Sequence, residues 1–120
     1  MAQLLGVHPI ELKPGVSVEE FERFLRQEWR PADIPGVRTS IVKADRGRHA
    51  GGHAFVIECD SAVRDRYWPT PGAGGASEEW TRVANRALGS PEQRRLQEKW
   101  DALAVGPPSA NYTDWVVIAE

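Results

Sequence analysis

Hydrophobic and polar residues alternate at helical spacing most clearly in residues 17–30. The apolar positions recur at steps of three and four, which places them on one side of a helix: Val18, Phe21, Phe24, Leu25 and Trp29. Ser17 precedes them and Glu20 follows three positions later, which is the pattern of a capping box. A stripe this wide, with two Phe and one Trp, predicts a helix packed against an apolar sheet.

Four other segments have the composition of β-strands, with branched and aromatic residues bounded by turn formers. They are residues 4–12, 37–44, 53–59 and 111–119. Pro9 in the first segment cannot donate to a ladder, so it predicts an edge, a bulge or an irregular stretch. Residues 45–52 are rich in turn formers and predict a hairpin connection.

Three more helices are expected between the third and the last strand. Asp60 or Ser61 can cap a short helix at residues 62–68, which the prolines that follow would stop. Ser77 caps a helix at residues 78–88, and Ser90 with Pro91 starts another that ends before the Gly-Pro-Pro at residues 106–108.

The predicted order is therefore strand, helix, strand, strand, helices, strand. This is the split βαβ order of an α+β, ferredoxin-like βαββαβ fold, an antiparallel sheet with helices on one face. We expect one domain, residues 1–120, with an extra helical segment at 77–105 before the last strand. Neither of the last two strands has a clean polar face, so the face without helices needs a cover. We predict a homodimer in which two such sheets pack face to face.

Charge and composition exclude several partners. The formal charge is −2 and the pI is about 5.9, and no basic stripe emerges, which argues against nucleic acid and anionic membranes. The single cysteine excludes an internal disulfide and favours a cytoplasmic location. The chain starts without the pattern of a signal peptide, and no apolar run reaches the length of a membrane span.

Two stretches of the sequence resemble a known superfamily. They are IELKPGVSVEEFERF, at residues 10–24, and GGHAFVIECDSAVRDRYWP, at residues 51–69, with a Pro-Gly-Val ahead of a strand between them. Together they resemble the dimeric α+β barrel superfamily, which includes stress-responsive barrel proteins, polyketide cyclases, cofactor-independent monooxygenases, EthD-like proteins and haem-degrading enzymes. The resemblance implies a homodimer whose sheets form the barrel, with a hydrophobic pocket between sheet and helices in each subunit.

Within this superfamily the chain is most similar to the plant polyketide cyclase type. There a His opens the third strand eight positions before the Ser of the next helix, as His53 and Ser61 do here. A Tyr near the end of that helix belongs to the cyclase pocket, and Tyr67 matches it approximately. The cyclases continue with a His-Pro-x-His run, whereas this chain has Trp68-Pro69-Thr70-Pro71.

The candidate catalytic residues are His53, Tyr67 and His8. Histidine is the natural acid or base near neutral pH, and His53 opens a strand where a pocket would open. His8 lies within a strand and would either orient a substrate or satisfy a hydrogen bond in the core. Asp114 interrupts an apolar strand and is either a desolvated base or the partner of Arg64 or Arg66.

The candidate substrate-binding residues are mostly aromatic: Trp68, Trp80, Phe24, Tyr112 and, as a polar group, Asp114. Trp68 and Trp80 flank the glycine-rich connection at residues 69–76 and could hold a flat ring. The spacing of His and Cys supports no metal site, and we expect no cofactor.

The leading prediction is a pocket that binds a small hydrophobic or aromatic, polyketide-like molecule. The chemistry would be cofactor-independent acid–base catalysis of the cyclase, isomerase or monooxygenase type. Two alternatives stay open, namely a non-catalytic ligand-binding or stress-type dimer, and a protein that binds or degrades haem.

Overall fold

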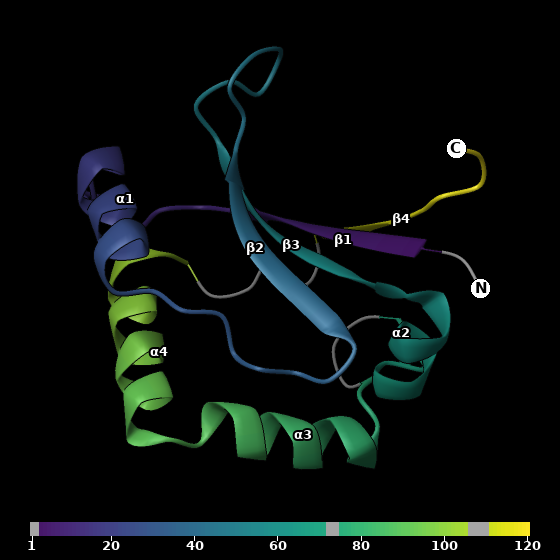
Figure 1. Ribbon diagram of the computed structural model, residues 1–120. Helices are drawn as coiled ribbons and strands as arrows, with labels where there is room; N and C mark the ends of the chain where they lie inside the picture. Colours follow the sequence, from purple (N-terminus) through teal and green to yellow (C-terminus); the bar gives the residue numbers. More distant parts are fainter. Residues whose placement is uncertain (1–2, 72–74, 106–110) are drawn as a thin grey trace.

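The computed structural model describes residues 3–71, 75–105 and 111–120, and shows an α+β protein (Figure 1). Its elements follow in the order β1 (Gln3–Ile10), α1 (Val18–Gln27), β2 (Val37–Lys43), β3 (His53–Asp60), α2 (Ser61–Tyr67), α3 (Glu78–Leu88), α4 (Pro91–Leu103) and β4 (Thr113–Val116). The four strands form one sheet in the order β2-β3-β1-β4, and every neighbouring pair is antiparallel. The α+β class and the antiparallel sheet are as predicted.

The element order corrects the ferredoxin-like expectation in part. Three helices, not one, separate β3 from β4, so the order is βαββαααβ instead of βαββαβ. The two additional helices, α3 and α4, fall within the extra helical segment expected at residues 77–105. They carry the chain away from the sheet and back again before β4 (Figure 1).

The helix starts follow the capping residues that the sequence contains. Ser17, Ser77 and Ser90 each accept a hydrogen bond from the backbone N–H three positions later. Asp60 caps α2 in a similar way, since its side chain accepts from the backbone N–H of Ala62, two positions later, at 2.8 Å. These bonds satisfy backbone donors that have no partner within the first helical turn, which is why the helix starts could be predicted to within one residue.

The strand ends are less predictable than the helix starts. The last strand was expected at residues 111–119 but spans only Thr113–Val116. It pairs with β1 from Leu4 to Val7, and the chain after β1 is bonded again where Glu11 and Lys13 meet Val105 and Leu103. Pro9 lies between these two paired stretches, so its missing N–H interrupts neither of them.

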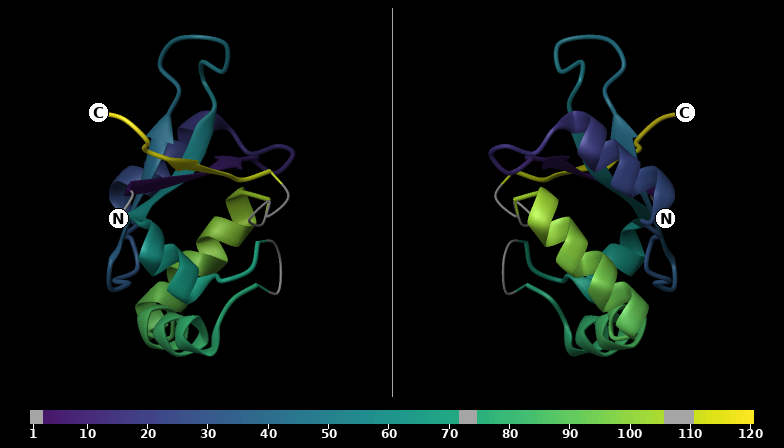
Figure 2. Two further views of the ribbon diagram at one scale, coloured as in Figure 1. Left: turned by 90° about the vertical axis from the view of Figure 1, so that its right-hand side faces the viewer. Right: turned by 90° about the vertical axis from the view of Figure 1, so that its left-hand side faces the viewer.

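The helices lie on one side of the sheet. Helices α2, α3 and α4 lie below it in Figure 2, and α1 stands above α4 at the end of the sheet in Figure 1. Phe21 of α1 is fully buried and contacts the rings of His53 and Trp100 edge-on, at 5.4 and 5.6 Å. In the described part of the chain, no helix is long and apolar enough to cross a bilayer.

The register divides the strand residues between two faces. The pairs Leu4↔Cys59 and His8↔Phe55 belong to the inner face, which the helices cover. The outer face contains Leu5 beside Trp115 and other apolar residues, namely Val7, Val42, Ala54 and Val56. Trp115 is 61% exposed, and none of the described helices covers this face (Figure 2).

A tight turn connects the helical layer to β2. The backbone N–H of Val37 bonds to the carbonyl of Ile34 at 3.0 Å, and Gly36 has a φ of +78°, a conformation that favours glycine at this position of a turn. The hydroxyl of Tyr67 donates to the carbonyl of Pro35 at 2.8 Å. This bond holds the end of α2 against the turn.

Candidate functional site

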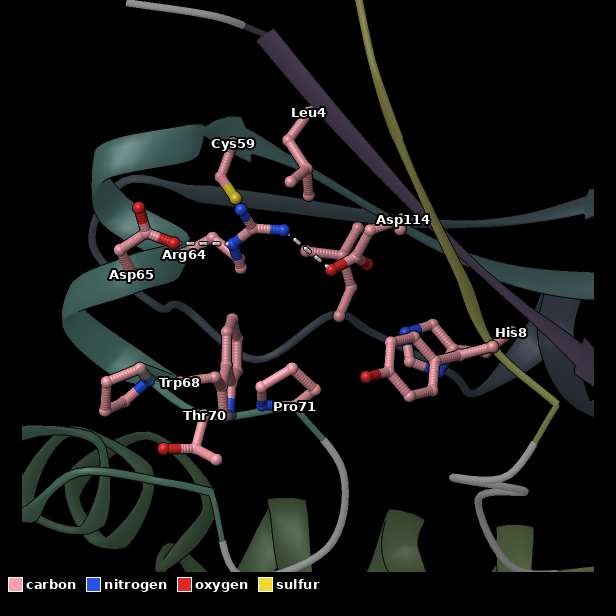
Figure 3. A pocket seen from close by; sticks show the side chains of 13 residues that line it. Leu4, His8, Cys59, Arg64, Asp65, Trp68, Thr70, Pro71 and Asp114 are labelled. Atoms are coloured by element: carbon pink, nitrogen blue, oxygen red, sulfur yellow. Dashed lines mark hydrogen bonds and ion pairs between the residues drawn. The ribbon is translucent and has the colours of Figure 1, made fainter.

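A cavity of about 390 Å³ opens under the inner face of the sheet, between β1, β4 and α2. We call it the polar chamber because His8, Arg64, Asp65 and Asp114 line it. Figure 3 shows Arg64 and Asp114 on one side of the space, Trp68 and Pro71 opposite them, and His8 at one end. The remaining wall comes from Leu4, Gly6, Ile57, Cys59, Pro69, Thr70 and Tyr112.

A second cavity of about 480 Å³ continues between the sheet and helices α3 and α4. We call it the aromatic chamber, because four of the five tryptophans line it together with one phenylalanine: Trp29, Trp68, Trp80, Trp100 and Phe55. His8, Ile57 and Trp68 line both chambers. The two chambers therefore adjoin, and the side chain of His8 borders both.

Arg64 holds two carboxylates in the polar chamber. Its Nε donates to Oδ1 of Asp65 at 2.8 Å and its Nη1 to Oδ2 of Asp114 at 3.0 Å. The hydrogen bond to Asp65 is the main reason that the pKa of the guanidinium is raised, and the bond to Asp114 adds to it against the effect of burial. Arg64 is thus a permanent cation that fixes the position of Asp114 of β4.

His8 is an unprotonated imidazole at neutral pH. Burial lowers its pKa from the ordinary value of 6.5, and the charge of Asp114 opposes that effect only in part. The ring stacks on Tyr112, with 5.5 Å between centroids and 18° between planes, and meets Phe55 edge-on at 6.0 Å. The contacts with Tyr112 and Phe55 thus fix the orientation of the neutral His8 ring, which can accept a proton.

Gly6 provides the space in which His8 and Asp114 come near each other. It pairs with Ile57 on one side and with Asp114 on the other. A Cβ at this position would lie 3.0 Å from Oδ1 of Asp114 and 3.7 Å from Nε2 of His8. A glycine inside a strand often marks such a close approach, so Gly6 is part of the site although it has no side chain.

Cys59 is a wall residue of the polar chamber and not a nucleophile. The side chain is buried, and burial raises the pKa of its thiol against the lowering effect of Arg64. The thiol therefore stays protonated at neutral pH and acts as a small apolar group.

Five of the candidate residues predicted from sequence line the cavities. Tyr112 and Asp114 face the polar chamber, Trp80 faces the aromatic chamber, and His8 and Trp68 face both. Asp114 lines the polar chamber and pairs with Arg64, which is the second of the two alternatives given for it. Residues 72–74 of the connection between Trp68 and Trp80 lie outside the described residues.

The other three candidates belong to the packing around the cavities, and the described lining of neither chamber includes them. Nε2 of His53 lies 2.8 Å from Oε2 of Glu22, which Lys43 also contacts, at 2.9 Å. The hydroxyl of Tyr67 is bonded to Pro35, and Phe24 is buried in the core. The two chambers therefore give no support to the catalytic role predicted for His53.

Several lining residues were not among the predicted site residues, including Trp29, Trp100, Arg64 and Asp65. Helical spacing does not show whether an apolar face such as that of Trp29 meets side chains or an empty space. The one usable signal for this cluster was the isolated Asp114 in an apolar strand, because a carboxylate there needs a cationic partner.

Comparisons with known proteins find no relative: no protein-family model, no curated protein and no solved structure is significantly similar to this chain. Within residues 3–71, 75–105 and 111–120, no three His, Cys, Asp or Glu side chains are grouped so that they could hold a metal ion. The proposals below therefore depend on the geometry of the two chambers.

Proposed function

We propose that this protein binds a small hydrophobic, aromatic molecule in the two adjoining chambers and catalyses cofactor-independent acid–base chemistry on it, with His8 as the acid–base residue. The observation that carries the proposal is the position of His8, whose imidazole lines both chambers. The aromatic chamber has the size and lining typical of small-molecule sites.

His8 has the properties of a general base. Burial keeps the imidazole neutral, so it can take a proton from an acidic O–H or C–H of a bound molecule. The imidazolium that forms is stabilised by Asp114, which Arg64 holds in place at 3.0 Å. The proton can then return to another atom of the same molecule, which is the sequence of steps in an isomerisation or a ring closure. Such a residue contributes about 10²–10⁴-fold to rate.

We also propose that the chain is a homodimeric α+β barrel with a ferredoxin-like sheet, as the sequence resemblance implies. In support, the outer face of the sheet presents Val42 and Trp115, which are 44% and 61% exposed, beside other apolar residues. A patch of this kind on a sheet is typical of a protein–protein interface. A second sheet packed on it would bury it.

Light scattering tests the dimer. A homodimer gives twice the 13.3 kDa of the chain, and Trp115→Lys should reduce it to the monomer mass. Val18→Lys is the matched control, because Val18 is an exposed apolar residue of α1 and not of the sheet. A 13 kDa species at micromolar concentration in the unaltered chain would refute the dimer.

Tryptophan fluorescence tests ligand binding, since four tryptophans surround the aromatic chamber. Titration with hydroxylated bicyclic and tricyclic aromatics should quench the emission. The quenching should persist in Trp115→Phe, whose ring lies on the outer face, and decrease in Trp68→Phe. If the quenching decreases equally in Trp115→Phe and Trp68→Phe, or if no compound quenches the emission in a saturable way, this binding site is refuted.

Product analysis then distinguishes an enzyme from a carrier. Mass spectrometry of the bound compounds after incubation should show an isomerised or cyclised product that His8→Gln no longer forms. Binding without any product would support the non-catalytic alternative. A Soret band on addition of haemin, retained in Trp68→Phe and lost in His8→Gln, would instead support the haem alternative.

A further inference from the structure

We propose that the ligand has two parts: a head that donates a hydrogen bond and carries no negative charge, such as a hydroxyl or an ammonium group, and a flat aromatic body. The head would occupy the polar chamber between His8 and Asp114, and the body the aromatic chamber. This inference depends on the proposed function, because it specifies the class of molecule that the same cavity accepts.

The polar chamber presents an excess of hydrogen-bond acceptors. Asp65 and Asp114 contribute two carboxylates, and a neutral imidazole at His8 accepts at one ring nitrogen. Arg64 already directs its Nε and Nη1 to these carboxylates. The groups left for a ligand near His8 thus favour an O–H or N–H donor.

The charges in the polar chamber disfavour an anion. One guanidinium faces two carboxylates, so the cluster carries a formal charge of −1 while His8 is neutral. The side chain of Asp65 is 66% exposed, so solvent screens its share of this charge. The thiol of Cys59, beside Arg64 in Figure 3, adds no charge because it stays protonated. A carboxylate or phosphate that approached Arg64 would also approach Asp114, whose side chain is only 26% exposed and therefore weakly screened.

The aromatic chamber selects the body of the ligand. The ring centroids of Trp68 and Trp80 lie 4.6 Å apart, with 51° between the ring planes. Trp100 and Leu96 of α4 also line this chamber. Rings and aliphatic side chains in this arrangement favour flat apolar molecules. Because His8 and Trp68 line both chambers, the bond between head and body would lie at His8.

Calorimetric titration of the full chain with 2-naphthol, 2-naphthoate and 2-naphthylmethylammonium at pH 7.5 tests this inference. These probes share one body and differ in the head. We expect naphthol and the ammonium probe to bind about tenfold tighter than naphthoate, the size expected for partly exposed charges. The ratio of naphthol to ammonium affinity distinguishes a neutral head from a cationic one.

Asp114→Asn and Asp65→Asn test the cause of the preference, since each removes one negative charge from the cluster. In at least one of these variants, naphthoate should gain several-fold on naphthol. Glu58→Gln is the matched control, because it makes the same charge change on the outer face, where Glu58 lies 3.8 Å from Arg38, and the preference should be unchanged.

The outcomes separate this inference from the proposed function. If naphthoate binds as tightly as naphthol, or if neither Asp variant shifts the preference, the head assignment is wrong while the binding site remains. If none of the three probes binds, and the hydroxylated aromatics fail as well, the proposed function itself is wrong. Circular dichroism of each variant shows whether it is folded.

Discussion

The two histidines on the inner face of the sheet have different surroundings. His53, at the start of β3, has a side chain only 6% exposed and bonds to Glu22 of α1. His8, in β1, lines both cavities, and the described residues offer its ring aromatic contacts but no hydrogen bond. One imidazole is thus engaged within the protein, whereas no residue of the described ranges bonds to a ring nitrogen of the other.

This difference shows how one residue type serves packing or chemistry according to its neighbours. A carboxylate 2.8 Å from Nε2 fixes the position of His53 and makes it a structural link between α1 and β3. The ring of His8 is desolvated, has a lowered pKa and lies beside a cavity. This is the arrangement expected of a reacting group. The following experiments test this contrast, from the largest expected effect to the smallest.

Turnover distinguishes the two histidines most strongly. His8→Gln should reduce the turnover of a substrate found by the ligand screen by about 10²–10⁴-fold, because the proton acceptor is lost. His53→Gln should retain turnover at a temperature at which it is folded. Steady-state kinetics measures both, and a large loss in His53→Gln alone would return the acid–base role to His53, as the sequence predicted.

Stability should show the opposite order. His53→Ala removes a buried ring that bonds to Glu22 and contacts Phe21 edge-on, and we expect it to lower the free energy of unfolding by about 1–3 kcal/mol. His8→Ala should cost less, because its ring faces open space. Urea denaturation followed by tryptophan fluorescence measures both values. An equal or larger loss in His8→Ala would mean that its ring is a core residue.

Gly6→Ala should weaken ligand binding with little change in stability. The added methyl group would lie 3.0 Å from Oδ1 of Asp114, so the carboxylate must move within the site. We expect affinity for 2-naphthol to fall about tenfold, the equivalent of 1.4 kcal/mol. In the background of Asp114→Ala the methyl has room, so the effect of Gly6→Ala should largely disappear. If Gly6→Ala reduces the affinity just as much in the Asp114→Ala background, displacement of Asp114 is not the cause of the loss.

Acid titration tests the His53 side of the contrast, and its effect should be the smallest. Hydrogen bonds from Lys43 and His53 lower the pKa of Glu22 from 4.5 to about 2. A lowered pKa stabilises the folded state above pH 4.5, and this contribution is lost as the pH falls toward 2.

The thermal midpoints of the unaltered chain and of Glu22→Gln should therefore differ above pH 5 and converge between pH 4.5 and 2. In Lys43→Gln the pKa of Glu22 should rise, because the hydrogen bond that lowers it most is absent. The lower end of the pH interval over which the stabilisation by Glu22 is lost should therefore lie at a higher pH. A difference between the chain and Glu22→Gln that does not depend on pH would show that Glu22 is not held by these partners.

Much of the fold could be predicted because local patterns specify it. Ser17, Ser77 and Ser90 mark three helix starts through bonds within one turn, and these bonds depend on no distant residue. The extent of β4 could not be predicted in the same way. Residues 111–119 all resemble a strand, but the length of the strand depends on pairing with β1, which ends at Val7.

The candidate site was predictable only in its residue types. Alternation placed Tyr112 and Asp114 on one face of the last strand, and β1 brings that face next to Gly6 and His8. The helices that cover this face leave a space beside His8, whereas they fill the space beside His53 with Phe21 and Glu22. No local pattern contains this information.

The sequence by itself determined which segments are helices and strands and which side chains can transfer protons, because these properties depend on spacing and on residue chemistry. Only the tertiary structure decided which histidine lies beside a cavity and that Arg64 joins Asp65 to Asp114. The physical reason is that burial, charge pairing and empty space are set by residues far apart in the chain. His8 and Asp114 stand more than a hundred positions apart in sequence, and the pairing of β1 with β4 brings both beside Gly6, which has no Cβ to fill the space.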